Sequence, residues 1–150
     1  MQYAKAKEKI KDILQNDNEN SLQDVVDFLQ ANFKNYTWIG IYIVKNKMLH
    51  LGPWQGDQST EHTRIPIGEG ICGSAVQSGN TENIADVKAD DRYLSCFLST
   101  RSEIVVPIKK NNDIIGEIDI DSDEINAFSK DDEVFLKEIA DMLSSHIRKT

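Results

Sequence analysis

Polar and hydrophobic residues alternate between positions 102 and 121, and this alternation predicts two strands. The runs 102–109 and 114–121 are separated by Lys-Asn-Asn-Asp at 110–113, whose turn residues favour a hairpin. Successive side chains of a strand point to opposite faces, so each run divides into an aliphatic face and a second face. The aliphatic face holds Ile104, Val106, Ile108, Ile118 and Ile120, and the second face holds Glu103, Val105, Glu117, Asp119 and Asp121. A sheet whose charged face meets water is the simplest interpretation of such a pattern, but a nearby cysteine and a third strand favour a pocket.

The third strand, predicted at 36–44, has the same two-faced pattern. Its aliphatic face holds Ile39, Ile41 and Ile43, and its other face holds Trp38, Gly40 and Tyr42. A further strand is predicted at 48–51, ending at the segment 52–56. Shorter extended pieces are expected at 64–67, where the residue before a proline avoids the helical region, and at 83–85.

Apolar residues at helical spacing predict three longer helices. The first covers residues 2–15, and the second begins at Ser21 as its N-cap, with Asp24 three residues on, and runs towards Phe33. In the last helix Ser129 and Asp132 form a start like a capping box. Its expected apolar stripe consists of Val134, Phe135, Ile139, Leu143 and Ile147.

The two cysteines are expected in the segments that cover the acidic face. Cys72 follows a glycine-rich turn at 68–73 and lies in a short helix, whose N-terminus is able to hold a carboxylate or lower the pKa of a thiol. Cys96 lies in the segment 86–101, which has no clear period and is expected to be a loop with at most a short helix. A lone cysteine is usually a small buried apolar residue, and Cys72 fits that description better than Cys96 does. Cys96 is therefore the stronger candidate for chemistry.

Together these elements predict an α+β fold. We expect an antiparallel sheet with the N- and C-terminal helices on one face and loops that cover a ligand pocket on the other. The sequence shows no internal repeat, linker or low-complexity stretch, so residues 1–150 are predicted to form a single domain.

Charge and composition narrow the function. The net charge of −8 argues against nucleic acid or an anionic membrane as partner, because binding to phosphates needs a basic patch. The chain has no apolar run long enough for a transmembrane helix and no signal-peptide pattern, so a cytoplasmic location with reduced cysteines is expected. Its 3 histidines and 2 cysteines show no zinc-type spacing, so no metal is predicted, and His62 is interpreted as a solvated loop residue.

Several motifs give the chain a recognisable pattern. They are Leu51-Gly52-Pro53-Trp54-Gln55-Gly56, Gly68-Glu69-Gly70-Ile71-Cys72-Gly73, Cys96 seven residues before Glu103, the run Arg101 to Pro107, and Asp119-Ile120-Asp121. The pattern resembles the GAF domain and, within it, the free methionine-(R)-sulfoxide reductases. The resemblance extends from about Trp38 to Asp121, and the terminal helices fit the same fold.

The resemblance implies reduction of free methionine-(R)-sulfoxide to methionine without metal or organic cofactor. It assigns Cys96 as the nucleophile, which becomes a sulfenic acid and condenses with a second cysteine to a disulfide that thioredoxin or another thiol reduces. In this chain Cys72, or an external thiol, is left for that resolving role. The resemblance places Glu103, Asp119 and Asp121 around the ammonium and sulfoxide groups of the substrate. It also implies that Trp38 lines the methyl pocket with Tyr42 beside it. Domains of this fold often form homodimers through their helices, but the sequence does not give the oligomeric state. This residue set agrees with simple chemistry, because carboxylates favour a cationic amino acid, and one of them, with its pKa raised by its neighbours, can protonate the sulfoxide oxygen.

Two departures from the family's pattern affect this prediction. The family commonly has a third cysteine ten positions before the one aligned with Cys72, where this chain has His62. The usual Gly-His-Ile-Ala-Cys-Asp around the nucleophile is here Arg92-Tyr93-Leu94-Ser95-Cys96-Phe97. Slower turnover or a changed reductant would follow from these differences. A non-catalytic GAF sensor that binds a small molecule such as an amino acid is the alternative hypothesis.

Overall fold

The computed structural model describes residues 3–94 and 97–147, which form a sheet with helices on both faces. The helices are α1 (Tyr3–Gln15), α2 (Ser21–Asn32), α3 (Gly70–Ser78) and α4 (Lys130–Leu143), with short 3-10 turns η1 (Val87–Ala89) and η2 (Ser144–His146). The strands are β1 (Trp38–Lys45), β2 (Met48–Gln55), β3 (Arg64–Pro66), β4 (Glu82–Ile84), β5 (Ser102–Lys110) and β6 (Asp113–Ser122). The predicted α+β class is confirmed.

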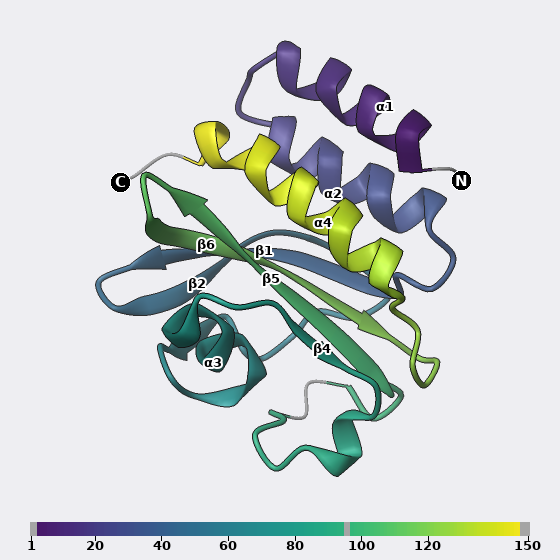
Figure 1. The fold of residues 1–150 in the computed structure, drawn as a ribbon, viewed down its shortest axis with the longest axis vertical. Coiled ribbons are helices and arrows are strands. Elements are labelled where there is room, and N and C mark those ends of the chain that lie inside the picture. The colour runs from purple at the N-terminus through teal and green to yellow at the C-terminus, as the bar shows by residue number, and fades with distance from the viewer. Residues whose placement is uncertain (1–2, 95–96, 148–150) are drawn as a thin grey trace.

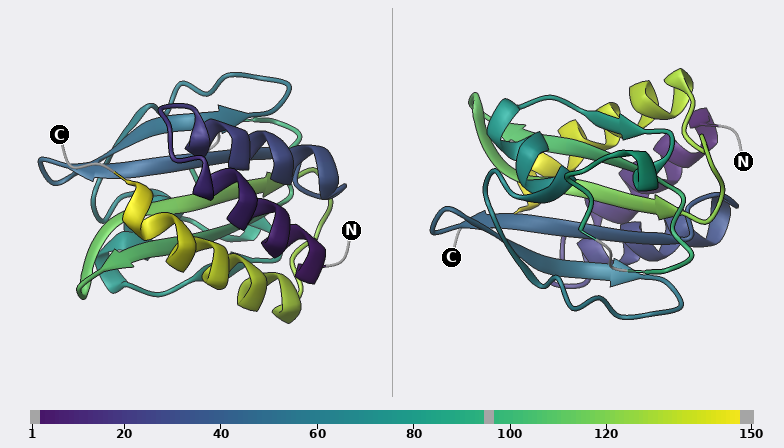
Figure 2. Two further views of the ribbon diagram at one scale, coloured as in Figure 1. Left: turned by 90° about the horizontal axis from the view of Figure 1, so that it is seen from above. Right: turned by 90° about the horizontal axis from the view of Figure 1, so that it is seen from below.

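The strands form one antiparallel sheet in the order β3-β2-β1-β6-β5-β4. Helices α1, α2 and α4 lie over one face, as the view from above in Figure 2 shows, and α3 with the long connections lies under the other. The strand β6 is central and pairs with β1 on one side and β5 on the other. The side chains of β6 therefore lie near the middle of the helix layer on one face of the sheet and near the middle of the layer of α3 and the long connections on the other face.

The predicted hairpin is β5 and β6, joined by a tight turn at Asn111 and Asn112. Both asparagines adopt positive φ, 52° and 70°, a left-handed conformation that asparagine tolerates better than most residues and that matches the twist of paired strands. Ile104 lies opposite Ile120 and Val106 lies opposite Ile118, so the aliphatic residues of the two strands share a face. That face packs against the helices, as the alternation predicted.

The helix layer and the aliphatic face of the sheet form the larger apolar core. Its members from the sheet include Ile39, Ile41, Ile104, Ile118 and Ile120, and its members from the helices include Ala6, Ile10, Val25, Val26, Leu29, Phe135, Leu136, Ile139, Ala140 and Leu143. The predicted stripe of the last helix is wrong at Val134, which is 53% exposed, and Ile147, although buried, lies beyond the end of α4. Leu136 and Ala140 are buried instead, since the helical repeat places them on the side of Phe135 and Ile139 that faces the sheet.

One carboxylate is buried in this helix layer, and it is fully partnered. Asp132 forms the predicted capping box with Ser129, whose backbone N–H and hydroxyl both donate to Asp132 Oδ2 at 2.8 and 3.0 Å. Its other oxygen accepts hydrogen bonds from Tyr36 Oη at 2.7 Å and Tyr3 Oη at 3.1 Å. Burial and the Asp132 charge raise the pKa of Tyr36, so its hydroxyl remains protonated as a donor.

Several boundaries differ from the sequence predictions; for example, β1 begins at Trp38 rather than at residue 36. Ser21 is the first residue of α2 rather than its N-cap; the cap position is Asn20, and the Ser21 hydroxyl accepts a hydrogen bond from the backbone N–H of Asn18. Strand β2 continues to Gln55 instead of ending at Leu51, because pairing with β1 resumes after a register shift near Gly40. Within residues 3–94 and 97–147, no helix has the length and apolar character needed to cross a membrane.

Candidate active site

Four carboxylates gather on the face of the sheet that lies away from the three long helices. Glu117, Asp119 and Asp121 alternate along β6, and Glu103 of β5 pairs directly with Asp121. Each of the four side chains is at most 5% exposed. The charged face does not meet water, so the simplest interpretation of the alternation is wrong, and the interpretation as a covered face is confirmed.

Helix α3 carries Cys72 to this acidic cluster, which we define as Glu103, Glu117, Asp119 and Asp121. The helix follows the predicted turn, in which Gly68 and Gly70 have φ values of 97° and 66° that favour glycine. Gly73 allows close packing, because a Cβ there would lie 2.7 Å from the carbonyl oxygen of Pro66. Cys72 is 6% exposed, and its Sγ lies within 4.8 Å of a carboxylate oxygen of Glu103 and one of Asp119.

Trp38 and Tyr42 of β1 lie on the same face as the acidic cluster, opposite Asp121 and Glu117 of β6. Their polar atoms hold the loop 57–63 against the sheet. Trp38 Nε1 donates to the carbonyl oxygen of Gln58 at 3.1 Å, and Tyr42 Oη donates to that of His62 at 2.7 Å. The two aromatic residues therefore form one wall of the site and fix the loop that covers it.

Gly40 lies between these two aromatic residues, directly opposite Asp119. A Cβ at this position would lie 2.5 Å from Cη2 of the Trp38 indole, so the indole occupies the space that a larger residue would fill. The indole stacks on Trp54 with ring centroids 6.2 Å apart and packs at a tilt against Phe97 at 5.8 Å. Trp54 alone could serve as a wall of the pocket or pack against the covering loop, and its stacking on Trp38 favours packing.

A small cavity of about 20 Å³ lies beside Cys72, with room for about one water-sized molecule. It is lined by Tyr42, His62, Ile65, Ile71, Cys72, Leu94, Glu103 and Asp119. A second hollow of about 50 Å³ lies at the Trp38 end, lined by Thr37, Trp38, Asp57, Gln58, Phe97, Ser99, Thr100, Asp121 and Asp123. An amino acid is larger than the first cavity, so a ligand of that size needs the covering segments to move.

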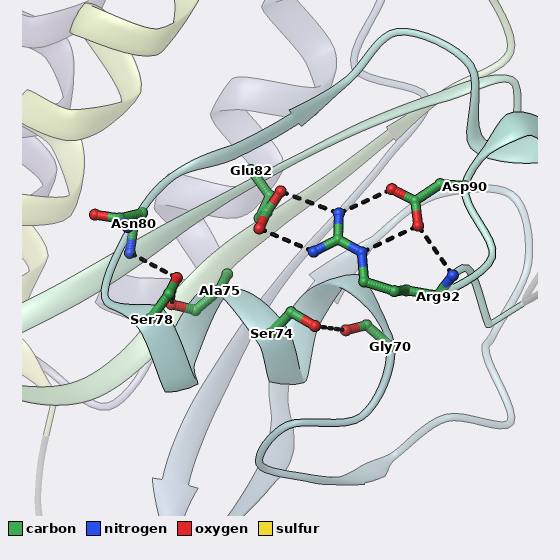
Figure 3. A network of polar contacts seen from close by, with 8 residues as sticks. All are labelled: Gly70, Ser74, Ala75, Ser78, Asn80, Glu82, Asp90 and Arg92. Carbon is green, nitrogen blue, oxygen red and sulfur yellow. Dashed lines mark hydrogen bonds and ion pairs between the residues drawn. The ribbon is translucent and has the colours of Figure 1, made fainter.

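One of these covering segments is held in place by an ion-pair clamp that we define as Arg92, Glu82 and Asp90 (Figure 3). Arg92 donates to both oxygens of Glu82 at 3.0 and 3.2 Å and to both oxygens of Asp90 at 3.0 and 2.8 Å. The hydrogen bonds from Arg92 lower the pKa of Asp90. Two residues beyond Arg92, Leu94 packs over Gly70 and lines the cavity, so the clamp joins the edge strand β4 to this covering residue.

The acidic cluster lacks compensating charge in the part of the chain that the structure describes. There, neither oxygen of Glu117 has a hydrogen-bond partner, nor does one oxygen of Asp119 or one of Asp121, and none of the ion pairs involves the cluster. Burial raises the pKa of all four carboxyls, and the Asp119 charge adds to this for Glu103, Glu117 and Asp121. The cluster therefore favours protonated carboxyls when empty and a cation when occupied.

The thiol of Cys72 responds to the same surroundings. Burial, followed by the charges of Asp119, Glu117 and Glu103, raises its pKa well above the ordinary value. The expectation that the α3 N-terminus lowers the pKa of a thiol is wrong for Cys72, because desolvation and three carboxylates outweigh the helix end. Cys72 at rest is a protonated thiol and a poor nucleophile.

The structure brings together all but one of the predicted site residues. Cys72, Tyr42, Glu103 and Asp119 surround the small cavity, and Trp38 and Asp121 line the neighbouring hollow. Cys96, the predicted nucleophile, lies outside the described residues. Sequence reasoning placed Glu117 on the same face as Asp119 and Asp121 but did not include it among the site residues. It also interpreted His62 as solvated, whereas the residue is half-buried and lines the cavity.

Comparisons with known proteins agree with this geometry. The family model of the GAF domain matches residues 17–147. The free methionine-R-sulfoxide reductase of Escherichia coli strain K12 is 34% identical over 130 residues, which are 87% of this chain and 78% of that protein. The structure of the type II free methionine-R-sulfoxide reductase from Thermoplasma acidophilum has a TM-score of 0.82 at 41% identity and covers 85% of this chain and 89% of that one. The fRMsr of Staphylococcus aureus in complex with substrate has a TM-score of 0.87 at 31% identity, covering 97% and 95% of the two chains.

Proposed function

This chain belongs to the GAF domain family and, within it, to the free methionine-R-sulfoxide reductases, and we propose that it reduces free methionine-(R)-sulfoxide to methionine by thiol chemistry. The observation that carries the proposal is the meeting of a thiol with a buried acidic cluster at one covered cavity. We further propose that residues 1–150 form one GAF domain. A free thiol beside the cavity suits a reducing compartment, so a cytoplasmic setting is proposed as well.

The acidic cluster supports recognition of a free amino acid. Buried carboxylate oxygens without a partner are unfavourable, and Asp119 and Asp121 each have one. The ammonium group of methionine sulfoxide supplies a positive charge and three N–H donors beside them and Glu103. A methionine within a peptide has an amide nitrogen in place of the ammonium, so it brings no such charge. The cluster therefore selects the free amino acid. The Trp38 indole offers an apolar surface for the S-methyl group, since sulfur and methyl groups pack well on aromatic rings.

The first chemical step in our proposal is the attack of the Cys96 sulfur on the sulfoxide sulfur. The attack forms a transient bond between the two sulfur atoms. The protonated oxygen then moves to the Cys96 sulfur as this bond and the S–O bond break, which leaves a sulfenic acid on Cys96 and releases methionine as the thioether. The cysteine sulfur is oxidised by two electrons and the sulfoxide is reduced by two. A carboxyl of the acidic cluster, kept protonated by its raised pKa, donates a proton to the sulfoxide oxygen as the S–O bond weakens.

The second step restores the enzyme through Cys72. Its protonated thiol condenses with the Cys96 sulfenic acid, which forms a disulfide and releases water. Thioredoxin or another dithiol then supplies two electrons and two protons and is itself oxidised to a disulfide. No metal or organic cofactor takes part in this scheme. The outer helices α1, α2 and α4 are proposed as the surface for homodimer formation.

The assay that tests the function counts turnovers. The reduced protein is incubated with free methionine-(R)-sulfoxide and dithiothreitol, and methionine is quantified against the amount of protein. We expect many methionine molecules per chain from the wild type and none above background from Cys96→Ser. Binding of the sulfoxide without turnover by the wild type would favour the GAF sensor instead.

Two further measurements test recognition of the substrate's ammonium group and the resolving role of Cys72 separately. N-acetyl-methionine-(R)-sulfoxide lacks the ammonium, so its kcat/KM should be lower by about 100-fold, which corresponds to about 2.7 kcal/mol of lost stabilisation. Equal rates for both substrates would contradict the role of the acidic cluster.

For Cys72→Ser we expect loss of turnover with thioredoxin and retention of turnover with dithiothreitol, because a small external thiol can replace the resolving cysteine. Unchanged turnover with thioredoxin would contradict that role of Cys72.

A further inference from the structure

Three potential metal ligands converge beside the small cavity from three different elements of the fold. Cys72 comes from α3, Glu103 from β5 and Asp119 from β6, and one ligand atom of each lies within 4.8 Å of the others. All three side chains are at most 6% exposed. The spacing of cysteines and histidines along the chain gave no zinc pattern, because two of these three ligands are carboxylates on separate strands.

An independent feature at the same place also points to a cation. Among the described residues, one oxygen of Asp119 and both oxygens of Glu117 are buried without a hydrogen-bond partner, and no lysine or arginine forms an ion pair with either residue. Unpartnered buried carboxylates are rare in folded proteins and are retained where something else satisfies them. In the substrate-free protein the ammonium group is absent, and a metal ion is a cation that the carboxylates and the nearby thiol can bind together.

We propose that the substrate-free protein binds a Zn²⁺ ion through the Cys72 thiolate and the carboxylates of Glu103 and Asp119, and that this ion excludes the substrate. Zinc accepts sulfur and oxygen ligands in a tetrahedral arrangement, at about 2.3 Å for sulfur and about 2.0–2.2 Å for oxygen. Ligand atoms in such a site lie about 3.3–3.8 Å apart. The observed separations are within reach of small side-chain rotations. The mixed set of one thiolate and two carboxylates favours Zn²⁺ over Mg²⁺ and Ca²⁺, which take oxygen ligands only.

The cavity and the surrounding charges fit this ion. A cavity of about 20 Å³ has room for one ion-bound water, which completes the tetrahedron. On binding, the S–H bond of Cys72 loses its proton to water, and the sulfur, now a thiolate, forms the bond to zinc without any change of oxidation state. The two positive charges of zinc offset the thiolate and one carboxylate, and they also reduce the repulsion within the rest of the acidic cluster.

The exclusion of substrate rests on the proposed function, whereas the metal site does not. A zinc ion on Glu103 and Asp119 occupies the place proposed for the substrate's ammonium, and it removes Cys72 from disulfide formation. Zinc therefore stops the reductase reversibly while protecting Cys72 from oxidation.

The metal site is tested with Co²⁺, which replaces Zn²⁺ in tetrahedral sites and gives an intense near-ultraviolet absorption when bonded to a thiolate. The reduced full-length protein is titrated with Co²⁺ without oxygen, and Zn²⁺ is then added to displace it. We expect the thiolate band in the wild type and in Cys96→Ser, and its loss in Cys72→Ser. Asp119→Asn should weaken Co²⁺ binding by at least the roughly 10- to 100-fold that even the outer partners of metal ligands contribute. Asp113→Asn is the matched control, because Asp113 begins the same strand but is exposed, and it should bind Co²⁺ as the wild type does.

A thiolate band that persists in Cys72→Ser, or its absence from the wild type, would overturn the metal site. Thermal unfolding of each variant checks its fold, and the Cys72→Ser and Asp119→Asn arms decide the result independently. Competition is measured by adding free methionine to the Co²⁺ complex, where a falling thiolate band is expected. A band that saturating methionine leaves unchanged would overturn the exclusion of substrate. Neither measurement requires turnover, so an inactive protein would refute the proposed reductase without affecting the test of the metal site.

Discussion

The two faces of the central sheet come from the same strands but treat buried charge in opposite ways. In the helix layer that covers one face, the buried carboxylate Asp132 of α4 accepts hydrogen bonds from Ser129, Tyr3 and Tyr36. On the opposite face, Glu117 is buried with neither oxygen bonded to any group in the described part of the chain. Asp132 is therefore part of a hydrogen-bond network in which both of its oxygens have partners. Glu117 belongs to a cluster whose unpartnered oxygens a bound cation can satisfy.

This difference separates stability from chemistry within single strands. Along β6, Ile118 and Ile120 contribute to the larger apolar core, while Glu117, Asp119 and Asp121 between them face the thiol and the aromatic wall. Burying apolar side chains stabilises the fold, whereas burying carboxylates without partners destabilises it. The helix face thus supports an acidic face that would be unfavourable on its own. Of two neighbouring residues on one strand, substitution of the apolar one should lower stability and spare activity. Substitution of the acidic one should lower activity without lowering stability.

The largest effect on stability is expected from Ile118→Ala. Ile118 is 1% exposed, and its replacement should lower the free energy of unfolding by about 3–4 kcal/mol, as for other large-to-small changes in cores. Urea denaturation measures this loss. At a temperature where the variant remains folded, its kcat/KM should stay within about threefold of the wild type. A variant that keeps full stability, or that loses activity while folded, would contradict the division between the two faces.

A smaller energetic effect is expected from Asp119→Asn, at the residue after Ile118 on β6. This substitution should lower activity rather than stability. The substitution removes a charge that faces Cys72 and Glu103, so kcat/KM for the free sulfoxide should fall about 100-fold, or about 2.7 kcal/mol. The free energy of unfolding at neutral pH should not fall, because a neutral amide relieves repulsion within the acidic cluster. Steady-state kinetics and urea denaturation on the same preparation check both parts. Loss of stability with unchanged kinetics would reverse the assignment of this face.

The acidic cluster also predicts a pH dependence of stability, isolated by Glu117→Gln. The folded state raises the pKa of Glu117 by burial and by the charge of Asp119, so it binds more protons than the unfolded chain above the ordinary glutamate pKa of about 4.3. The contribution of Glu117 to the free energy of unfolding is greatest below that pH. It decreases as the pH rises towards the pKa of Glu117 in the folded state. Glu103, Asp119, Asp121 and the Cys72 thiol face the same region and change in the same direction.

Urea denaturation from about pH 5 to about pH 8 tests this expectation. Wild-type stability should fall more steeply over that range than the stability of Glu117→Gln, which should be the more stable protein at the upper end. Added methionine should flatten the wild-type curve, because its ammonium group favours the charged carboxylates. Parallel curves for the two proteins would show that Glu117 keeps an ordinary pKa.

The smallest effect is expected from the clamp at the edge of the acidic face. Arg92→Ala removes ion pairs whose side chains are 19–40% exposed, so the loss of stability should be about 0.5–1 kcal/mol and should shrink with added salt. Lys130→Ala, which breaks an ion pair with an 84% exposed lysine, is the control and should change stability less. In a Cys96→Ser background, Arg92→Ala should also increase the rate at which a thiol reagent labels Cys72, because Leu94 is held less firmly over the cavity. Equal labelling rates would leave the clamp without influence on the site.

Much of the fold was predictable because local patterns determine it. The period-2 alternation located β1, β5 and β6 and assigned their faces, and the asparagines at 111 and 112 favoured a tight turn. The Ser129–Asp132 capping box marked the start of α4. Predictions failed where a choice depends on packing against a distant element. Val134 and Leu136 are both apolar and two residues apart, and only the position of the sheet decides which of them is buried.

The site shows the same limit. The alternation placed Glu103 and Asp119 on one face, and it placed Glu117 there as well. No local sequence pattern distinguished a buried acidic face from a solvent-exposed one. The half-buried position of His62 follows from the hydrogen bond between its carbonyl oxygen and Tyr42, 20 residues earlier in the chain. No local pattern encodes such a contact.

The sequence alone determined the order of helices and strands, the acidic and aliphatic faces of the hairpin, and the motifs of the family, since each depends on residues close together along the chain. Only the tertiary structure decided that the carboxylates are buried, that burial raises the pKa of the Cys72 thiol among them, and that its sulfur lies within 4.8 Å of carboxylate oxygens of Glu103 and Asp119. The physical reason is that desolvation and charge repulsion depend on what covers a residue. Here the covering groups come from α3 and the loops; Cys72, for example, lies 31 residues before Glu103 and 47 residues before Asp119 in the chain.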